Sequence, residues 1–144
     1  MRVFNVHRGQ DTGGWGHRLE QAFADDPDVT FDSMYAPNAF LYIDYPDSLP
    51  WDRKVAKQLW QAADVIHLHN GFRGARLFEQ YGKRPLLVQY HGSKFRANPQ
   101  HLLQEQRRRG ATAIVSTLDL WLIAPEDTEW LPSPYNLDWL RSLT

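Results

Sequence analysis

Residues 84–93, with the sequence RPLLVQYHGS, constrain the fold of this 144-residue chain more than any other stretch. The apolar run 86–88 gives way abruptly to His91, Gly92 and Ser93. Such a run fits a strand buried on both faces of a parallel sheet, although the pattern alone also fits a buried helical segment. Ligands of open α/β sheets bind just beyond the carboxyl ends of the strands. We therefore predict a functional site here, where Gly92 allows a sharp turn or a close approach of the backbone to a ligand.

Strand-like and helix-like patterns alternate along almost the whole chain. Strands are predicted at residues 2–6, 29–35, 64–71, 84–93, 111–116 and 129–131, and helices at about 15–24, 50–63, 72–81 and 98–110. Gly82 and Gly110 are typical of helix ends, and Asn98 with Pro99 is typical of a helix start. The alternation predicts the α/β class, as a single Rossmann-like domain over residues 1–144. Its parallel sheet is expected to carry helices on both faces, joined by right-handed crossovers.

Two segments interrupt this alternation. Residues 36–50 form a long loop rich in tyrosine and proline, which is either a binding loop or a lid packed on the core. Residues 132–144 form a C-terminal segment, and a helical turn is predicted there with Leu137, Trp139 and Leu140.

A glycine-rich loop follows the first predicted strand and precedes the first predicted helix. It contains Gly13 and Gly14 within the sequence HRGQDTGGWGH. A strand, a glycine-rich loop and a helix in this order present backbone N–H groups and a helix N-terminus to a phosphate group. The spacing matches neither the dinucleotide-binding fingerprint nor the P-loop, so a simple tight turn is an equal alternative to a ligand-binding loop.

Two histidines lie in the strand predicted at residues 64–71, which reads DVIHLHNG. His67 and His69 are two residues apart and should point to the same side of that strand. They suggest a metal site that His91 would complete, but no acidic ligand lies close in sequence and zinc needs a defined tetrahedral set. Hydrogen-bonded structural histidines are the favoured interpretation, and no metal is predicted.

The carboxyl ends of parallel strands meet at one edge of a sheet, so the polar residues that follow these strands should share that edge. The ligand-binding candidates at this edge are Gly13, Gly14, His69, Asn70, Gly92, Ser93 and Thr117. His91 can add a hydrogen bond, or a positive charge when protonated, because its ordinary pKa lies close to neutrality. The alternative is that His91 only satisfies a buried backbone carbonyl.

Composition narrows the class of protein. The net charge of −1 argues against general nucleic-acid binding, although residues 73–110 hold nine bases against two acids and can face an anionic ligand. The chain has no cysteine, which excludes disulfides and thiolate metal sites. No apolar run approaches membrane-spanning length, and the sequence MRVFNVHRG lacks the apolar region of a signal peptide. We expect a cytoplasmic protein without a membrane span.

The order of these motifs resembles the N-terminal half of GT-B glycosyltransferases, especially the retaining, family-four-like group. The matching features are the first strand with Gly13 and Gly14, DVIHLHN, the strand ending in His91 and Gly92, AIVSTLDL, and WLPSPYN. The resemblance implies that Gly13 and Gly14 lie near the donor diphosphate. It also implies that His91 lies in the catalytic cleft near the transferred sugar, which makes it the catalytic candidate.

The resemblance implies a nucleotide-diphosphate sugar as donor substrate and no cofactor. Members of the family have a second Rossmann-like domain that supplies most of the nucleotide-sugar contacts, and this chain stops shortly after Pro134, about where the interdomain linker would begin. We therefore expect the acceptor-side half of a glycosyltransferase, inactive until a donor-binding half or partner protein joins it. The alternatives are a non-catalytic module that binds a phosphorylated or sugar ligand, and an interaction protein that reuses the fold and self-associates.

Overall fold

The computed structural model describes residues 1–7, 15–35, 49–50, 52–72, 75–77, 79–124 and 128–130. The predicted glycine-rich loop with Gly13 and Gly14, most of the loop at 36–50 and the segment 132–144 lie outside these residues. No helix in the described part of the chain is both long enough and apolar enough to cross a membrane.

Strands and helices alternate in the order that the sequence predicts. The strands are β1 (Arg2–His7), β2 (Thr30–Tyr35), β3 (Leu49–Pro50), β4 (Val65–His69), β5 (Leu86–Tyr90), β6 (Thr112–Val115) and β7 (Thr128–Trp130). The helices are α1 (Trp15–Ala22), α2 (Arg53–Ala62), α3 (Ser93–Ala97), α4 (Pro99–Arg109) and α5 (Leu118–Ile123), with 3-10 turns η1 (Ala75–Leu77) and η2 (Glu79–Tyr81).

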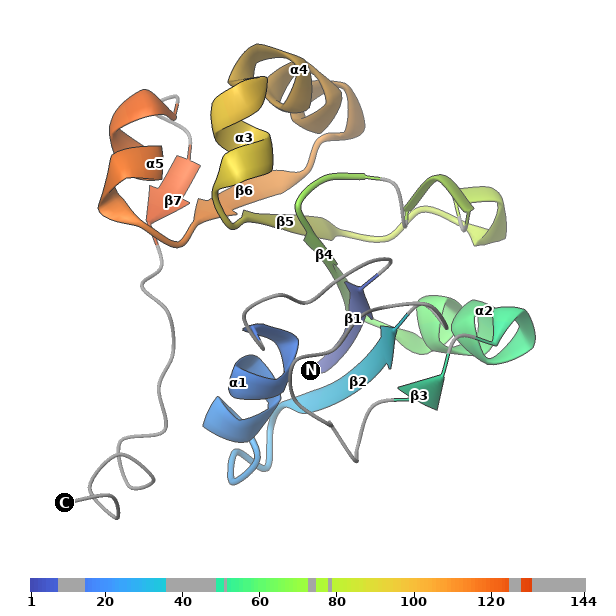
Figure 1. Ribbon diagram of the computed structural model, residues 1–144. Coiled ribbons are helices and arrows are strands. Elements are labelled where there is room, and N and C mark those ends of the chain that lie inside the picture. The colour runs from blue at the N-terminus through green and yellow to red at the C-terminus, as the bar shows by residue number, and fades with distance from the viewer. Residues whose placement is uncertain are drawn as a thin grey trace, which may run out of the picture.

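The described strands form one seven-stranded sheet in the order β3-β2-β1-β4-β5-β6-β7, and every pair is parallel. The chain moves outward from β1 to β3, returns through α2 to β4, and then moves outward in the other direction (Figure 1). The strand order therefore reverses between β1 and β4, which is the place where ligands bind in open α/β sheets. The predicted Rossmann-like α/β fold class is confirmed.

One face of the sheet carries the main hydrophobic core. Because side chains alternate along a strand, Phe4, Ile66 and Val88 point to this face. They cluster with buried residues of the helices that follow β3, β5 and β6, namely Leu59 and Trp60 of α2, Phe95 of α3, Leu102 of α4 and Leu120 of α5. We call this the helix-rich face.

The opposite face is covered differently, and we call it the α1 face. In Figure 1, α1 and α2 lie on opposite sides of β1 and β2. The ring of Phe23, directly after α1, stacks on Phe31 of β2 with 5.4 Å between the ring centroids. Apolar residues of this face, such as Val3 and Val65, lie toward the amino-terminal ends of the strands, whereas Asn5 and Gln89 lie in the carboxyl-terminal halves. The α1 face thus has an apolar part and a polar part.

Local capping explains where the helices begin and end. The Asp52 side chain accepts hydrogen bonds from the backbone N–H groups of Lys54 and Val55, which fixes the start of α2. Asn98 caps α4 in the same way through the N–H of His101, and Gly110 ends that helix in the left-handed conformation. These ends of α4 are as the sequence predicts.

Three details differ from the sequence prediction. The helix expected at residues 72–81 is two 3-10 turns, although Gly82 follows them with a φ of 113°. The helices α3 and α5 each begin three residues after the end of β5 or β6, in stretches too short to show a helical period. Residues 49–50, expected to close the long loop, pair with the end of β2 as β3.

Candidate functional site

A row of hydrogen-bonded side chains crosses the α1 face at the carboxyl ends of the strands. We call it the polar row, and it consists of Ser33, Asn5, His69, His91 and Ser116. Nδ1 of His69 lies 2.7 Å from Nε2 of His91, and Nε2 of His69 lies 2.7 Å from Oδ1 of Asn5. The row spans the reversal of strand order between β1 and β4, so it occupies the predicted ligand edge.

The donors in this row all point the same way. Asn5 donates its Nδ2–H to Oγ of Ser33 at 3.0 Å, so its Oδ1 must accept the Nε2–H of His69. A neutral His69 then has only an acceptor left at Nδ1, and His91 must donate its Nε2–H there. Nδ1 of His91 is then an acceptor and lies 3.3 Å from Oγ of Ser116, whose one hydroxyl proton is shared between this nitrogen and the backbone carbonyl of Tyr90 at 3.5 Å. Gln89 completes the order by donating Nε2–H to Ser116 Oγ at 3.0 Å.

Burial favours the neutral form of His67 and of His91. Burial first, and then electrostatic repulsion from nearby His67, lower the pKa of His91 from 6.5 to about 3. Burial also lowers the pKa of His67 to about 4, an effect that the side chain of Gln89 partly opposes. At neutral pH His91 therefore offers hydrogen bonds, and the positively charged form that its ordinary pKa allows is disfavoured.

Two residues next to the row fix its geometry. Asn70 has a positive φ of 56°, and its Oδ1 accepts the backbone N–H of His91 at 3.0 Å. Gly92 has a φ of 132°, and a Cβ at this position would lie 3.0 Å from Nη1 of Arg96. Asn70 thus positions His91 through the backbone, and Gly92 lets the Arg96 guanidinium approach the end of β5.

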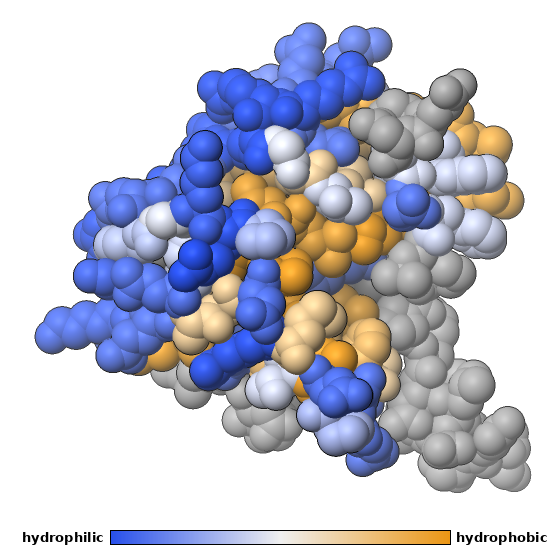
Figure 2. Space-filling view, turned by 180° about the vertical axis from the view of Figure 1, so that it is seen from behind, coloured by the Kyte–Doolittle hydropathy of each residue, from blue (hydrophilic) through white to orange (hydrophobic). Residues whose placement is uncertain are grey.

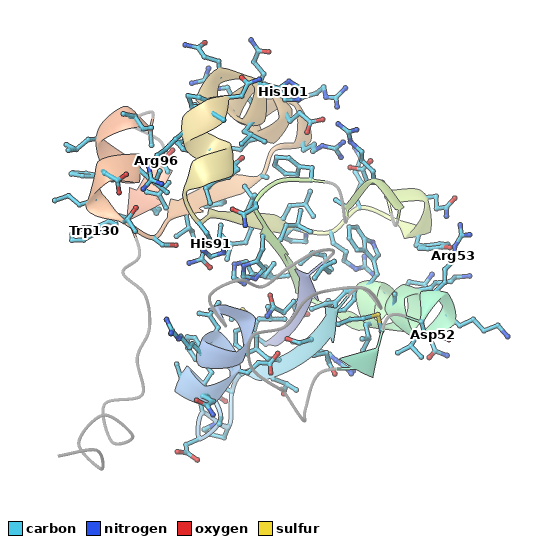
Figure 3. All side chains as sticks on the ribbon, in the orientation of Figure 1. Asp52, Arg53, His91, Arg96, His101 and Trp130 are labelled. Carbon is cyan, nitrogen blue, oxygen red and sulfur yellow. The ribbon has the colours of Figure 1, made fainter. Side chains whose placement is uncertain are left out.

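Sequence reasoning missed a charged pair at the same edge. Arg96 of α3 donates to Oδ2 of Asp119 in α5 through Nε at 2.8 Å and through Nη2 at 2.5 Å. The hydroxyl of Thr117 and then the Arg96 guanidinium lower the pKa of Asp119 by stabilising its charged form. Figure 3 shows Arg96 and His91 on the same side of the molecule, away from Asp52 and Arg53 at the start of α2. Neither α3 nor α5 is evident in the sequence, so no pattern placed this pair beside His91.

The structure brings together most of the predicted site residues. His69, Asn70, His91 and Gly92 lie in or beside the polar row, and Thr117 follows Ser116 at the end of β6. Ser93 is the first residue of α3, directly after Gly92. Gly13 and Gly14 lie outside the described residues. Asn5, Ser33 and Ser116 were not predicted as row members, because a single polar residue in a strand gives no signal of its partner on another strand.

The three clustered histidines bond to their neighbours instead of converging on a point. The ring centroids of His67 and His69 are 4.3 Å apart, and those of His69 and His91 are 5.0 Å apart. Within the residues that the structure describes, no group of three or more histidine, aspartate or glutamate side chains is arranged to hold a metal ion. Both ring nitrogens of His69 and of His91 already bond within the row, so a hydroxyl or amide group of a ligand would take the place of one of these partners.

Comparison with known proteins agrees with this fold. No protein-family model matches the sequence, and no curated protein matches it. The chain is similar in structure to an alpha-glucosyltransferase solved in complex with UDP and a 13-mer DNA containing a central A:G mismatch, with a TM-score of 0.68 and 13% sequence identity. The match covers 99% of this chain and 43% of the glucosyltransferase chain. The fold is therefore glycosyltransferase-like, and the chain spans less than half of the length of that enzyme.

Proposed function

We propose that this chain is the acceptor-side, N-terminal half of a GT-B, family-four-like retaining glycosyltransferase that uses a nucleotide-sugar donor. The observation that carries the proposal is the polar row, which lies at the strand-order reversal of a glycosyltransferase-like sheet. This is the part of an open α/β sheet where a ligand binds.

The chemistry of the row fits a sugar better than a strongly charged ligand. A sugar hydroxyl both donates and accepts a hydrogen bond, so it can replace a row partner of the neutral His91 ring, which has the same capacity. His91 is the candidate residue for contact with the transferred sugar, because it follows β5 directly and is only partly buried. Arg96, half-exposed beside Gly92, supplies a cation for a phosphate at the same edge.

Transfer requires that donor and acceptor are held together in a near-attack geometry. The chain corresponds to 43% of the similar glucosyltransferase, so a second half is proposed to hold the nucleotide sugar, supplied by a longer chain or a partner protein. The 144-residue chain alone is then expected to be folded and to transfer no sugar.

A binding experiment tests this function. UDP, UDP-glucose, glucose and a 13-mer DNA duplex would each be titrated into the chain, with the thermal midpoint and the histidine NMR resonances as readouts. We expect a sugar-bearing ligand to shift the resonances of His69 and His91, and His91→Ala to weaken that binding, whereas the control His101→Ala on exposed α4 keeps it. Robust transfer by the chain alone, or binding that is indifferent to His91, would contradict the proposal.

A second candidate is an interaction protein, and it rests on an exposed apolar surface. This surface, which we call the α5 patch, consists of Leu118, Trp121, Leu122, Ile123 and Trp130. Trp121 is 45% exposed and Trp130 is 47% exposed, with 6.2 Å between their ring centroids. Large exposed apolar patches mark interaction sites. Light scattering that shows a monomer at all concentrations would count against self-association through this patch.

A further inference from the structure

A pocket of about 380 Å³ lies between the carboxyl-terminal ends of α2 and α4, beside η2. Residues that line it include Trp60, Glu79, Lys83, Arg84, Arg108 and Arg109. These residues precede β4, β5 and β6, so the pocket lies at the amino-terminal ends of those strands. The five residues of β5, about 17 Å of extended chain, separate this end from His91. We call this feature the basic pocket.

Positive charge exceeds negative charge around the basic pocket. Of the charged described residues that line it, four are basic and only Glu79 is acidic. The sequence shows the same excess, because residues 73–110 hold nine bases against two acids, and none of these bases belongs to the polar row. Hydrophilic residues cover the upper part of the molecule in Figure 2, where Figure 1 places α4. The excess of positive charge favours an anionic occupant.

The two acids in this region do not balance the guanidinium groups around them. Oε1 of Glu105 accepts hydrogen bonds from Arg76 and from Nη2 of Arg108, the latter at 3.4 Å. Glu79 pairs with Arg109. Three guanidinium groups therefore share two carboxylates, and an anion in the pocket would relieve the repulsion among them.

Arg84 and Lys83 add two charges that no described carboxylate pairs. The Arg84 guanidinium donates its Nε–H to the carbonyl of Trp60 at 3.2 Å and an Nη2–H to the carbonyl of Gln61 at 2.6 Å. These bonds hold the guanidinium at the end of α2, and because a carbonyl has no formal charge, Arg84 keeps its positive charge. Lys83 is exposed, so its ammonium group can move towards a ligand.

Arg109 gives a second, independent observation. Its side chain is only 10% exposed, and its Nε makes no hydrogen bond with any described residue. The ring centroid of Phe72 lies 5.2 Å from its Cζ, so an aromatic ring covers one side of the guanidinium. Burial, and then repulsion from Arg76, lower the pKa of Arg109 because they disfavour its charged form. A buried donor without a partner, beside a pocket of positive charge, is suited to an anionic acceptor.

We propose that the basic pocket binds a small molecule through a phosphate or diphosphate group. Guanidinium groups present pairs of N–H donors that match the spacing of phosphate oxygens, and a lysine ammonium adds a compact charge. The pocket has the volume of a small-ligand site, which is about 300–1,000 Å³. Because it lies at the opposite end of β5 from the polar row, this site is independent of the proposed sugar site.

Calorimetric titration of pyrophosphate into the full 144-residue chain, at an ionic strength held constant with sodium chloride, tests the proposal. Lys83→Gln and Arg108→Gln each remove an exposed charge from the pocket, so the fold should be kept. Each should raise the Kd of pyrophosphate by about fivefold or more. The control Arg107→Gln removes the neighbouring exposed charge of α4, which does not line the pocket, and should change the Kd by less than about twofold.

Three outcomes would overturn the proposal. The first is that pyrophosphate does not bind. The second is that Arg107→Gln weakens binding as much as Arg108→Gln, which would show a general effect of surface charge. The third is that pyrophosphate shifts the NMR resonances of His91 and keeps its affinity in both pocket variants, which would place the anion beside the polar row.

Parallel titrations distinguish a small ligand from a larger anionic partner. A DNA duplex and vesicles that contain an anionic lipid would be added to the native chain, Lys83→Gln and Arg108→Gln. We expect pyrophosphate to compete with neither and to bind in their absence. Binding of DNA or vesicles that requires Lys83 and Arg108, together with no binding of pyrophosphate, would assign the basic pocket to a macromolecule or a membrane surface and overturn the proposal.

Discussion

The imidazole rings of His69 and His91 stack 9° from parallel, with Nδ1 of His69 2.7 Å from Nε2 of His91. This side-chain contact links the end of β4 to the residue that follows β5. Both nitrogens of His91 are engaged, since Nδ1 lies 3.3 Å from the Ser116 hydroxyl. The orientation of His91 is therefore set by the protein before any ligand arrives, and a ligand that bonds to Nε2 must displace His69.

The contact between the two rings predicts a coupled loss of stability. His69→Ala and His91→Ala should each lower the free energy of unfolding by about 1–3 kcal/mol, because each leaves a polar group of the row without its partner. The double variant should cost less than the sum, since the second substitution removes a partner that is already lost. Urea unfolding of the four proteins measures this coupling. Strictly additive losses would show that the two rings do not interact in solution.

The spacing of apolar residues and the polar residues that end the apolar runs were sufficient to predict the sheet. Its core strands are apolar runs of about five residues bounded by Gly82 or Pro85 and by polar residues. This pattern can be read from the sequence without knowing which strands pair with each other. The short helices α3 and α5 were missed because five or six residues do not complete two turns. The 3-10 turns at 75–81 have apolar residues at helical spacing, and tertiary packing overrides that local preference.

The candidate site was predictable where it follows strand ends and was not where it depends on pairing. His69, His91 and Gly92 stand where an apolar run ends, and this change of residue type is visible in the sequence. Asn5 and Ser33 join the row only because the β1–β2 register places them side by side, and a single sequence does not contain that register. Sequence reasoning left two roles open for His91, a hydrogen bond or a positive charge, and burial by residues distant in sequence favours the neutral form that offers hydrogen bonds.

Asn70 should be replaceable by aspartate but not by alanine. Its φ of 56° favours Asn, Asp or Gly, and its Oδ1 accepts the N–H of His91. Asn70→Asp keeps both properties, Asn70→Gly keeps only the backbone conformation, and Asn70→Ala keeps neither. We expect losses of unfolding free energy in that order, reaching about 2–4 kcal/mol for alanine from the strained backbone and the lost hydrogen bond together. Thermal or urea unfolding ranks the three, and equal losses for glycine and alanine would remove the backbone part of this account.

Alanine substitutions at Gly92 and at Gly110 can be compared to test backbone strain and close packing. Both have positive φ, but a Cβ at Gly92 would lie 3.0 Å from Nη1 of Arg96, whereas a Cβ at Gly110 meets nothing within 4 Å. Gly110→Ala should cost about 1–2 kcal/mol, the penalty of the left-handed region. Gly92→Ala should cost more, because its φ of 132° is essentially confined to glycine and Arg96 must also move. If Gly110→Ala is the more damaging change, close packing at the end of β5 is not the reason for Gly92.

Acid should destabilise the chain through its buried histidines. The folded-state pKa of His67 is about 4 and that of His91 is about 3, both below the ordinary value of 6.5. Between these values the unfolded chain binds more protons than the folded chain, so stability is fully present above pH 6.5 and falls as the pH drops towards 4. For His67 alone the loss between pH 7.5 and pH 5 is about 2 kcal/mol.

The variant His67→Gln isolates this effect, because glutamine keeps a polar side chain and does not titrate. Its free energy of unfolding should fall less steeply than that of the native chain between pH 7.5 and pH 5, a range that lies above the ordinary pKa of most carboxylates. His101→Gln is the control, since His101 is exposed on α4 and contributes to no buried network. Urea unfolding at three pH values gives the slopes. A slope in His67→Gln as steep as in the native chain would mean that His67 is protonated as readily in the fold as outside it, and that acid acts on the structure elsewhere.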